Sequence, residues 1–117
     1  MDREQLIALC LDRPGAYLDA PWGDEDSVVK VGGKIFCFLG ASDGPTAISV
    51  KNTREAVAEW RDRFPDHIGV PRYLKKDLWN SVDVTASGGP DADDVRELID
   101  DSYRLVVESL PKSKRPS

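Results

Sequence analysis

The sequence has few of the residues that catalysis and metal binding use most often. Its 117 residues include two cysteines and one histidine, and no GxSxG, HExxH, GxGxxG or phosphate-loop motif occurs. Cys10 and Cys37 stand in apolar stretches without CxxC spacing, which predicts two free, buried thiols. His67 follows Asp66, but a triad also needs an oriented nucleophile, so we interpret His67 as a loop residue. We therefore expect a protein that is not an enzyme and that uses no cofactor or metal.

Long apolar segments are missing as well. The chain has no apolar run of about 18 residues and no basic-then-apolar leader at its N-terminus. These absences predict a cytoplasmic protein with no membrane span.

An excess of positive charge, which is typical of nucleic-acid-binding proteins, is also absent, because the formal net charge is −5. The charges are unevenly distributed, however: residues 1–29 carry a net −5, residues 30–80 a net +3 and residues 81–117 a net −3. The middle of the chain is therefore a positive band that allows a local basic surface. We interpret the acidic residues near position 25 and at the start of the last helix as solvated faces, because EF-hand spacing is absent.

A strong hairpin signal lies at residues 26–39, DSVVKVGGKIFCFL. Two runs of β-branched and aromatic residues flank Gly32 and Gly33, and a two-residue primed turn needs positive φ at both central positions. With Val31 opposite Lys34, a regular register predicts one face with Val29, Val31, Phe36 and Phe38, and another with Val28, Ile35, Cys37 and Leu39. The second strand is apolar on both faces, so we expect it inside a sheet.

The remaining segments predict three helices and several short strands. The expected order is a helix over 3–11, an edge strand around Tyr17 and Leu18, the hairpin, a strand over 46–50, a helix that starts at Asn52 and stops at Pro65, a strand over 79–85, and a helix from Asp91 to about Leu110. Short connections imply antiparallel strands, and the helices must cover one face of the sheet. The predicted fold class is α+β with two layers, an antiparallel β-sheet and helices on one of its faces.

We expect one domain over residues 1–110, because this length is sufficient for a proper core. Residues 111–117 are basic and rich in proline. We expect them to be a disordered tail.

The positive band supplies the main candidate site. Its cations lie close in sequence to aromatic residues and an amide, a mixture that contacts phosphates and stacks on, or hydrogen-bonds to, bases. The candidate DNA-binding residues are Lys30, Lys34, Lys51, Arg72, Lys75, Lys76, Trp79 and Asn80. Lys30 and Lys34 flank the Gly-Gly turn, and a lysine-tipped hairpin is one way to reach a DNA groove. The alternative is that these cations only make the surface soluble.

Several stretches, in this order, resemble the MmcQ/YjbR family. They are Pro14-Gly15-Ala16, Trp22-Gly23, KVGGKIF at 30–36, Ile48-Ser49-Val50-Lys51, Tyr73-Leu74-Lys75-Lys76, WNSV at 79–82 and Leu98-Ile99-Asp100-Asp101-Ser102-Tyr103. Together they extend over nearly the whole chain, from about Gln5 to Leu110. One departure is Val70-Pro71-Arg72-Tyr73-Leu74, which lacks the histidine that precedes the WN motif in the family pattern.

The resemblance implies a small bacterial protein whose fold is similar to secretion chaperones and to the frataxin homologue CyaY. It also implies DNA binding through a double-wing motif, with the lysine-tipped hairpin as one wing. We therefore predict a non-enzymatic protein that binds double-stranded DNA, in which the cations contact phosphates while Trp79 and Asn80 support the loop or touch a base. The alternatives are a protein-interaction module, whose apolar sheet face or groove binds a peptide or second subunit, and a CyaY-like metal binder.

Overall fold

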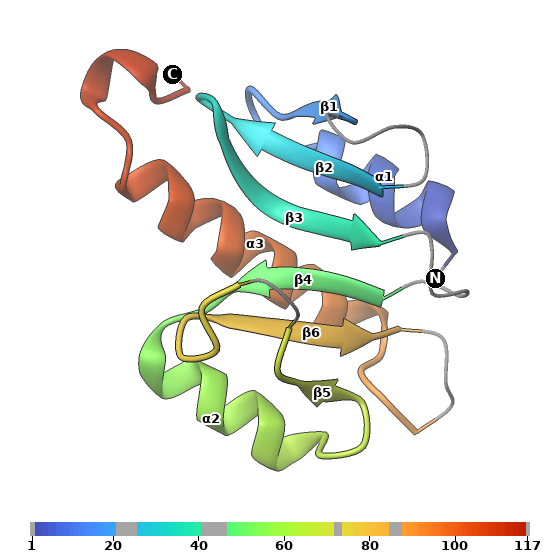
Figure 1. Cartoon of the computed structure of the whole chain (residues 1–117). Coiled ribbons are helices and arrows are strands. Elements are labelled where there is room, and N and C mark those ends of the chain that lie inside the picture. Colours follow the sequence, from blue (N-terminus) through green and yellow to red (C-terminus); the bar gives the residue numbers. More distant parts are fainter. Residues whose placement is uncertain (1, 21–25, 41–46, 72–73, 85–87, 117) are drawn as a thin grey trace.

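The protein, a computed structural model, combines three α-helices with one six-stranded sheet (Figure 1). The structure describes residues 2–20, 26–40, 47–71, 74–84 and 88–116. The helices are α1 (Arg3–Leu11), α2 (Arg54–Arg63) and α3 (Ala92–Glu108), and the strands are β1 (Tyr17–Asp19), β2 (Asp26–Val31), β3 (Lys34–Gly40), β4 (Ala47–Lys51), β5 (Ile68–Gly69) and β6 (Trp79–Asp83).

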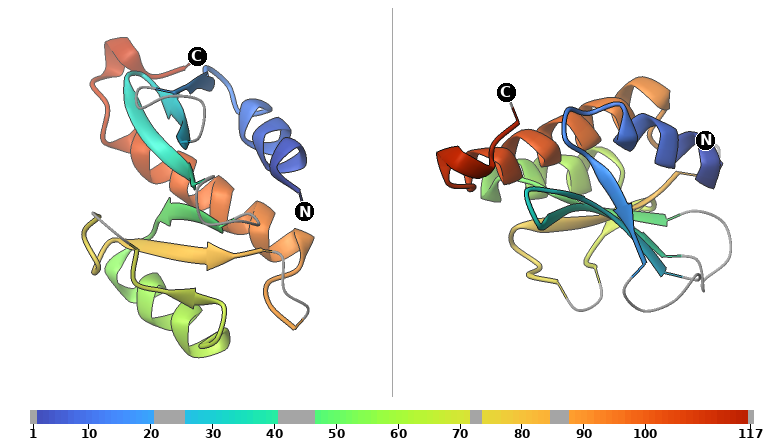
Figure 2. Two further views of the ribbon diagram at one scale, coloured as in Figure 1. Left: turned by 45° about the vertical axis from the view of Figure 1, so that its right-hand side comes forward. Right: turned by 90° about the horizontal axis from the view of Figure 1, so that it is seen from above.

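The sheet is antiparallel throughout, with the strand order β1-β2-β3-β4-β6-β5. All three helices lie on one face of it, as Figure 2 shows from above. The predicted α+β class and two-layer arrangement are therefore confirmed. The two-residue strand β5 was not predicted, because two residues are too few for an alternating pattern to be recognisable.

Side-chain caps set where the helices begin. Asp2 accepts the Gln5 amide at 2.8 Å and Asp91 accepts the Asp94 amide at 2.9 Å, so both outer helices start with capping boxes. The cap of α2 is Thr53, whose hydroxyl accepts the Ala56 amide at 3.1 Å, and not Asn52 as the sequence indicated. Asn52 is instead buried, at 1% exposure.

A β-bulge changes the predicted register of the hairpin. Val31 does pair with Lys34, but the pairing shifts between Val29 and Lys30, so that Val29 lies opposite Cys37. An extra residue on β3 lets Phe36 and Cys37 both join the core beneath the helices, whereas a regular register separates them onto opposite faces. The predicted assignment of Phe38 to the Phe36 face is therefore wrong, because Phe38 pairs with Ser49 on the face away from the helices.

A serine from α3 joins β3 to β4 just beyond their last Cα pair, Cys37 and Val50. The hydroxyl of Ser102 accepts the Lys51 amide at 2.8 Å and donates to the Phe36 carbonyl at 2.5 Å. Ser102 is completely buried. One hydroxyl thus satisfies a donor and an acceptor at the bulge.

The residues after α3 differ from the expected disordered tail. Lys112–Lys114 form a 3-10 helix, and the chain packs back against the β2–β3 turn, as Figure 1 shows. Within the described part of the chain, no helix is both long and apolar enough to cross a membrane.

Candidate nucleic-acid interface

Basic residues from the middle of the chain gather at one end of the sheet, which we call the basic end. β2 ends at Val31 where β3 begins, β4 ends at Lys51, and β6 begins at Trp79. Because neighbouring strands are antiparallel, these points all fall at the same end, on the left of Figure 1. The basic end is defined by Lys30, Lys34, Lys51, Lys75, Lys76 and Trp79.

The lysines of the basic end differ in how free their charges are. Lys30 forms an ion pair of 2.8 Å with Asp19, and this hydrogen bond raises the pKa of Lys30 and lowers the pKa of Asp19. Lys34 contacts the Ser109 hydroxyl at 3.4 Å. Of the residues that the structure describes, none gives Lys34, Lys51, Lys75 or Lys76 a carboxylate partner. Four cations are therefore available to an anionic ligand.

An arginine that the sequence did not reveal holds the exposed Lys75-Lys76 pair in place. Arg61 of α2 donates from Nη2 to the carbonyls of Lys76, at 2.7 Å, and Trp79, at 3.2 Å. Its partners are backbone carbonyls, which every residue has, so no residue pattern points to this contact. The guanidinium thereby fixes the turn before β6 against α2.

The two polar and aromatic candidates of the WN motif lie on opposite faces of β6. Trp79 pairs with Lys51 on the face away from the helices and is partly exposed. Asn80 is completely buried; its amide donates to Asn52 Oδ1 at 2.9 Å and its oxygen accepts Arg61 Nε at 2.8 Å. A buried amide with these partners supports the turn and does not reach a base, so Asn80 is not part of the exposed surface.

The other cations of the band are spread over the molecule. Arg63, at the end of α2, pairs with Asp94 in the first turn of α3 at 3.3 Å, away from the basic end. Arg54, at the start of α2, pairs with Asp77 at 3.3 Å across exposed surface. Beside it, a groove of about 580 Å³ has Arg54, Arg61 and Lys76 in its wall, together with Val57 and Val70. Arg72 and Tyr73 lie outside the described residues.

Acidic residues dominate the opposite end of the sheet. β6 ends at Asp83, and Arg3 of α1 donates to Ser27 Oγ at 2.8 Å, which fixes the start of α1 at this end. Ser109, the C-cap of α3, contacts Lys34, so the C-terminal end of α3 lies at the basic end. The N-terminal end of α3 therefore lies on the acidic side. The acidic residues at these starts are Asp2, Glu4, Asp91, Asp93 and Asp94. These five acidic residues therefore lie at the end of the molecule away from the lysines, whereas Asp19, Asp77 and Glu108 lie near the basic end.

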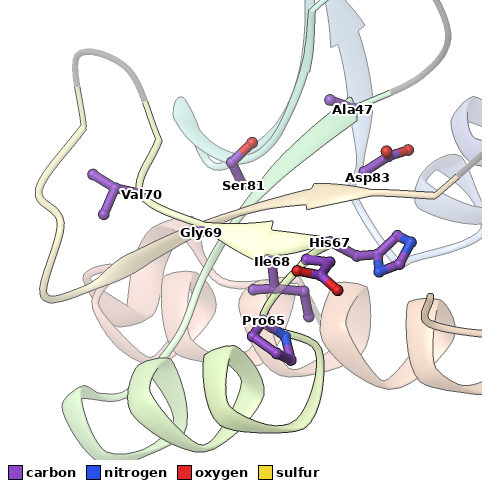
Figure 3. A pocket seen from close by; sticks show the side chains of 9 residues that line it. Ala47, Pro65, His67, Ile68, Gly69, Val70, Ser81 and Asp83 are labelled. Carbon is purple, nitrogen blue, oxygen red and sulfur yellow. The ribbon is translucent and has the colours of Figure 1, made fainter. Parts of the chain in front are cut away.

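His67 lies in a small pocket with both polar and apolar lining residues at the β5 edge. The pocket measures about 230 Å³, with His67 and Asp83 at one end and Val70 at the other (Figure 3). Among the described residues, none forms a hydrogen bond or ion pair with the His67 imidazole. The pocket therefore shows no nucleophile and base in contact.

Cys10 of α1 and Cys37 of β3 meet inside the core as free thiols, and both are completely buried. Their mutual hydrogen bond, together with burial, raises the pKa of Cys37 well above its usual value. A thiol with a raised pKa is a poor nucleophile. No group of three His, Cys, Asp or Glu side chains suited to a metal ion occurs in the described ranges.

Most motifs that carry the family resemblance serve the fold. Ser102 bridges β3 and β4, and Asn80 anchors Arg61. The Tyr103 hydroxyl donates to the Pro14 carbonyl at 2.6 Å, and its ring meets Phe36 edge-on at 5.3 Å. Gly32 has positive φ and lies close to Leu110. Of these motifs, the exposed Lys34, Lys75 and Lys76 remain free to contact a partner.

Known proteins are similar to this chain over nearly its whole length. An Escherichia coli protein named YjbR is 28% identical over 115 residues, covering 98% of this chain and 95% of its own length. A second Escherichia coli protein, named YbdF, is 32% identical, with 96% of this chain and 93% of its own covered.

Solved structures share the fold. A crystal structure of a Deinococcus radiodurans protein with a DUF419 domain has a TM-score of 0.83 and 28% identity, covering 95% of this chain and 83% of that one. A Pseudomonas syringae protein has a TM-score of 0.72 and 23% identity, covering 90% of this chain and 98% of that one. The YjbR profile matches residues 11–105. Since that match spans most of the sequence, the chain belongs to the YjbR family.

Proposed function

We propose that this protein binds double-stranded DNA through the basic end of the sheet and catalyses no reaction. The observation that supports this most is the convergence of cations distant in sequence: antiparallel pairing brings the end of β4 beside the β2–β3 turn and the start of β6. Lys34 and Lys51 lie on the sheet, and Arg61 holds the turn that carries Lys75 and Lys76. Cations held in this way match a phosphate backbone better than cations on independent loops, because less backbone freedom remains to be lost on binding.

Lys75, Lys76 and Lys34 are exposed and contact phosphates in this proposal. Lys51 and Trp79 lie side by side on the open face, where the indole rests against the sugar-phosphate backbone. Lys30 contributes less, because Asp19 already balances its charge. The β2–β3 hairpin corresponds to the wing that the family resemblance implies.

The separation of charge within the molecule also favours this orientation. Acidic residues at the far end repel a polyanion, while the basic end attracts it, so an approaching duplex is steered to one side of the protein. A net charge of −5 is therefore compatible with binding. It predicts weak, salt-sensitive affinity, because the total field of the protein is repulsive.

Fluorescence anisotropy of a labelled duplex of about 20 base pairs, at about 50 and about 200 mM salt, tests the proposal. We expect wild-type affinity to fall by an order of magnitude or more between these conditions, as counterion release predicts for several phosphate contacts. Lys75→Ala/Lys76→Ala is expected to bind more weakly with a shallower salt slope. The matched control, Arg96→Ala/Arg104→Ala, removes the same charge from the exposed surface of α3 and is expected to bind like wild type.

A wild-type protein that does not bind duplex at about 50 mM salt would overturn the proposal. Equal weakening by the two double variants would show that only total charge matters, and would remove the assignment of Lys75 and Lys76. Circular dichroism of each variant checks that the fold is retained.

A second candidate function, peptide or subunit binding, is favoured by the edge strand β1. Tyr17 and Leu18 of this strand are 44% and 45% exposed, and Leu11 at the end of α1 is 41% exposed. An exposed apolar edge strand can accept another strand through its free backbone groups. Binding of this kind is insensitive to salt, so the same titration series with a candidate partner separates the two functions.

A further inference from the structure

The segment after α3, residues 111–116, is anchored to the body of the protein although its composition is that of a flexible tail. Arg115 folds back and donates from Nε to the Leu110 carbonyl and from Nη2 to the Glu108 carbonyl, both at 2.9 Å. The Lys114 amide donates to the Pro111 carbonyl at 2.9 Å. These bonds hold the 3-10 helix in a defined position at the end of α3.

The segment rests on two glycine turns. A Cβ placed on Gly32 would lie 2.5 Å from Leu110 Cδ1 and 3.0 Å from the Lys114 carbonyl oxygen, and one placed on Gly15 would lie 3.0 Å from Pro116 Cγ. Leu110 itself is 3% exposed. The chain after α3 is thus packed directly against the tip of the β2–β3 hairpin, as Figures 1 and 2 both show.

This packing brings together positive charges from the hairpin and from the end of the chain, which are more than 70 positions apart in the sequence. Lys112, Lys114 and Arg115 are exposed on the segment, and Lys34 lies at the hairpin tip, where it contacts Ser109. We call these four residues the tail cluster. In the part of the chain that the structure describes, none of the four has a carboxylate within ion-pair distance. Glu108 is the acidic residue of the last turn of α3, and its carbonyl binds Arg115.

We propose that the tail cluster is a second phosphate-binding surface for duplex DNA, continuous with the basic end through Lys34. This inference rests on the proposed function and adds three cations, Lys112, Lys114 and Arg115, that lie outside the positive band of the sequence. The cluster has no exposed aromatic or amide side chain among its members, so it binds backbone phosphates and adds affinity without sequence preference.

The chemistry of the cluster favours a nucleic-acid backbone over an anionic membrane. A membrane-surface site combines cations with exposed apolar side chains that enter the lipid boundary. The exposed large apolar residues of the described chain are Leu11, Tyr17, Leu18 and Val70, and none belongs to the tail cluster. Tyr17 and Leu18 lie close by, on β1 just after the Gly15 turn that Pro116 contacts. Successive side chains of a strand point to opposite faces, so these two residues form no continuous apolar surface that could enter lipid beside the cluster.

The test compares Lys112→Gln/Lys114→Gln with the control Arg96→Gln/Arg104→Gln and with Lys75→Gln/Lys76→Gln, in full-length protein. Both tail lysines are exposed and their side chains make no anchoring bond, so the fold is expected to survive. Anisotropy is measured on two duplexes of unrelated sequence over a series of salt concentrations. We expect the tail variant to lose roughly tenfold in affinity at about 50 mM salt on both duplexes, with a salt slope shallower by about two.

The possible outcomes separate this inference from the proposed function. If the tail variant binds like the control while the Lys75/Lys76 variant binds weakly, the tail cluster is excluded and the proposed function stands. If the wild-type protein binds neither duplex, both the proposed function and the inference about the tail cluster are overturned. If the tail variant loses binding to phosphatidylserine-containing vesicles but not to DNA, the cluster is a lipid site and the inference is overturned. A loss confined to one duplex would also overturn it, because phosphate contacts carry no sequence information.

Discussion

Ser102 donates a hydrogen bond of 2.5 Å from its buried hydroxyl to the carbonyl of Phe36, on a strand 66 positions away in the sequence. The same oxygen accepts the Lys51 amide, so a side chain of α3 takes the place of a strand-to-strand hydrogen bond. The β3–β4 pairing next to the basic end, and with it the position of Lys51, therefore depends on one hydroxyl group.

Replacing this hydroxyl tests its importance. Ser102→Ala leaves the Phe36 carbonyl and the Lys51 amide without their partner in a buried site, so we expect a loss of about 1–3 kcal/mol in the free energy of unfolding. Urea denaturation measures it, with Ser113→Ala on the exposed 3-10 helix as the control. Equal stability of the two variants would mean that water satisfies both groups.

The turn glycines allow a matched pair of substitutions. Gly32 and Gly33 both have positive φ, 58° and 86°, but only Gly32 would bring its Cβ against Leu110 and the Lys114 carbonyl. Alanine at either position costs about 1–2 kcal/mol in backbone strain, and at Gly32 a further 1–3 kcal/mol, roughly, from overpacking. We therefore expect Gly32→Ala to have a lower melting temperature than Gly33→Ala in thermal unfolding. The reverse order would show that the segment after α3 does not pack on the turn.

Arg61 and Asn80 are expected to act as a unit. Their hydrogen bond of 2.8 Å is partly buried, and Arg61 also holds the carbonyls of Lys76 and Trp79. A double-mutant cycle with Arg61→Ala and Asn80→Ala should give a coupling free energy of about 0.5–3 kcal/mol. Additive effects would indicate that each residue supports the turn independently.

The thiol pair predicts slow chemical modification. Because Cys10 and Cys37 are fully buried and the pKa of Cys37 is raised, we expect a thiol reagent at about pH 8 to react only as fast as the protein unfolds. Stopped-flow labelling with and without urea measures this. Rapid labelling of one cysteine in native protein, with Cys10→Ala and Cys37→Ala variants to identify it, would contradict the prediction.

Tyr103 predicts a loss of stability at high pH. Burial raises the pKa of this phenol, so the folded state favours its neutral form, which donates to the Pro14 carbonyl. A raised folded pKa gives a contribution that is complete below the unfolded value of about 10 and is lost as pH rises through the folded pKa. Tyr103→Phe should therefore cost about 1 kcal/mol near pH 7 and progressively less above pH 10, as measured by urea unfolding. A constant difference at all pH values would show that Tyr103 does not ionise in this range.

Features that depend only on neighbouring residues could be predicted from the sequence. The Gly-Gly turn, the helix over residues 3–11 and the start of the last helix at Asp91 follow from local sequence, and the structure confirms them. The position of the Phe36–Cys37 bulge and the cap at Thr53 were not predicted, because each depends on a contact with another element.

For the candidate site, the sequence identified the lysines but could not show which are free. Lys30 forms an ion pair with Asp19, a residue of another strand. The side-chain amide of Asn80 is hydrogen-bonded to Arg61 and Asn52. The tail cluster was missed because composition indicated disorder in a segment that tertiary contacts hold in place.

The amino-acid sequence by itself determined the three helices, every strand except the two-residue β5, and the fold class, since these follow from local propensity and from the periodicity of apolar residues. The antiparallel topology decided which charges meet, because strand order brings together residues that are distant in the chain. Tertiary packing also decided which polar groups are buried and which charged groups have a partner of opposite charge. These choices depend on distances between elements, which a linear sequence does not contain, and they leave the exposed cations of the basic end and the tail cluster available to a partner.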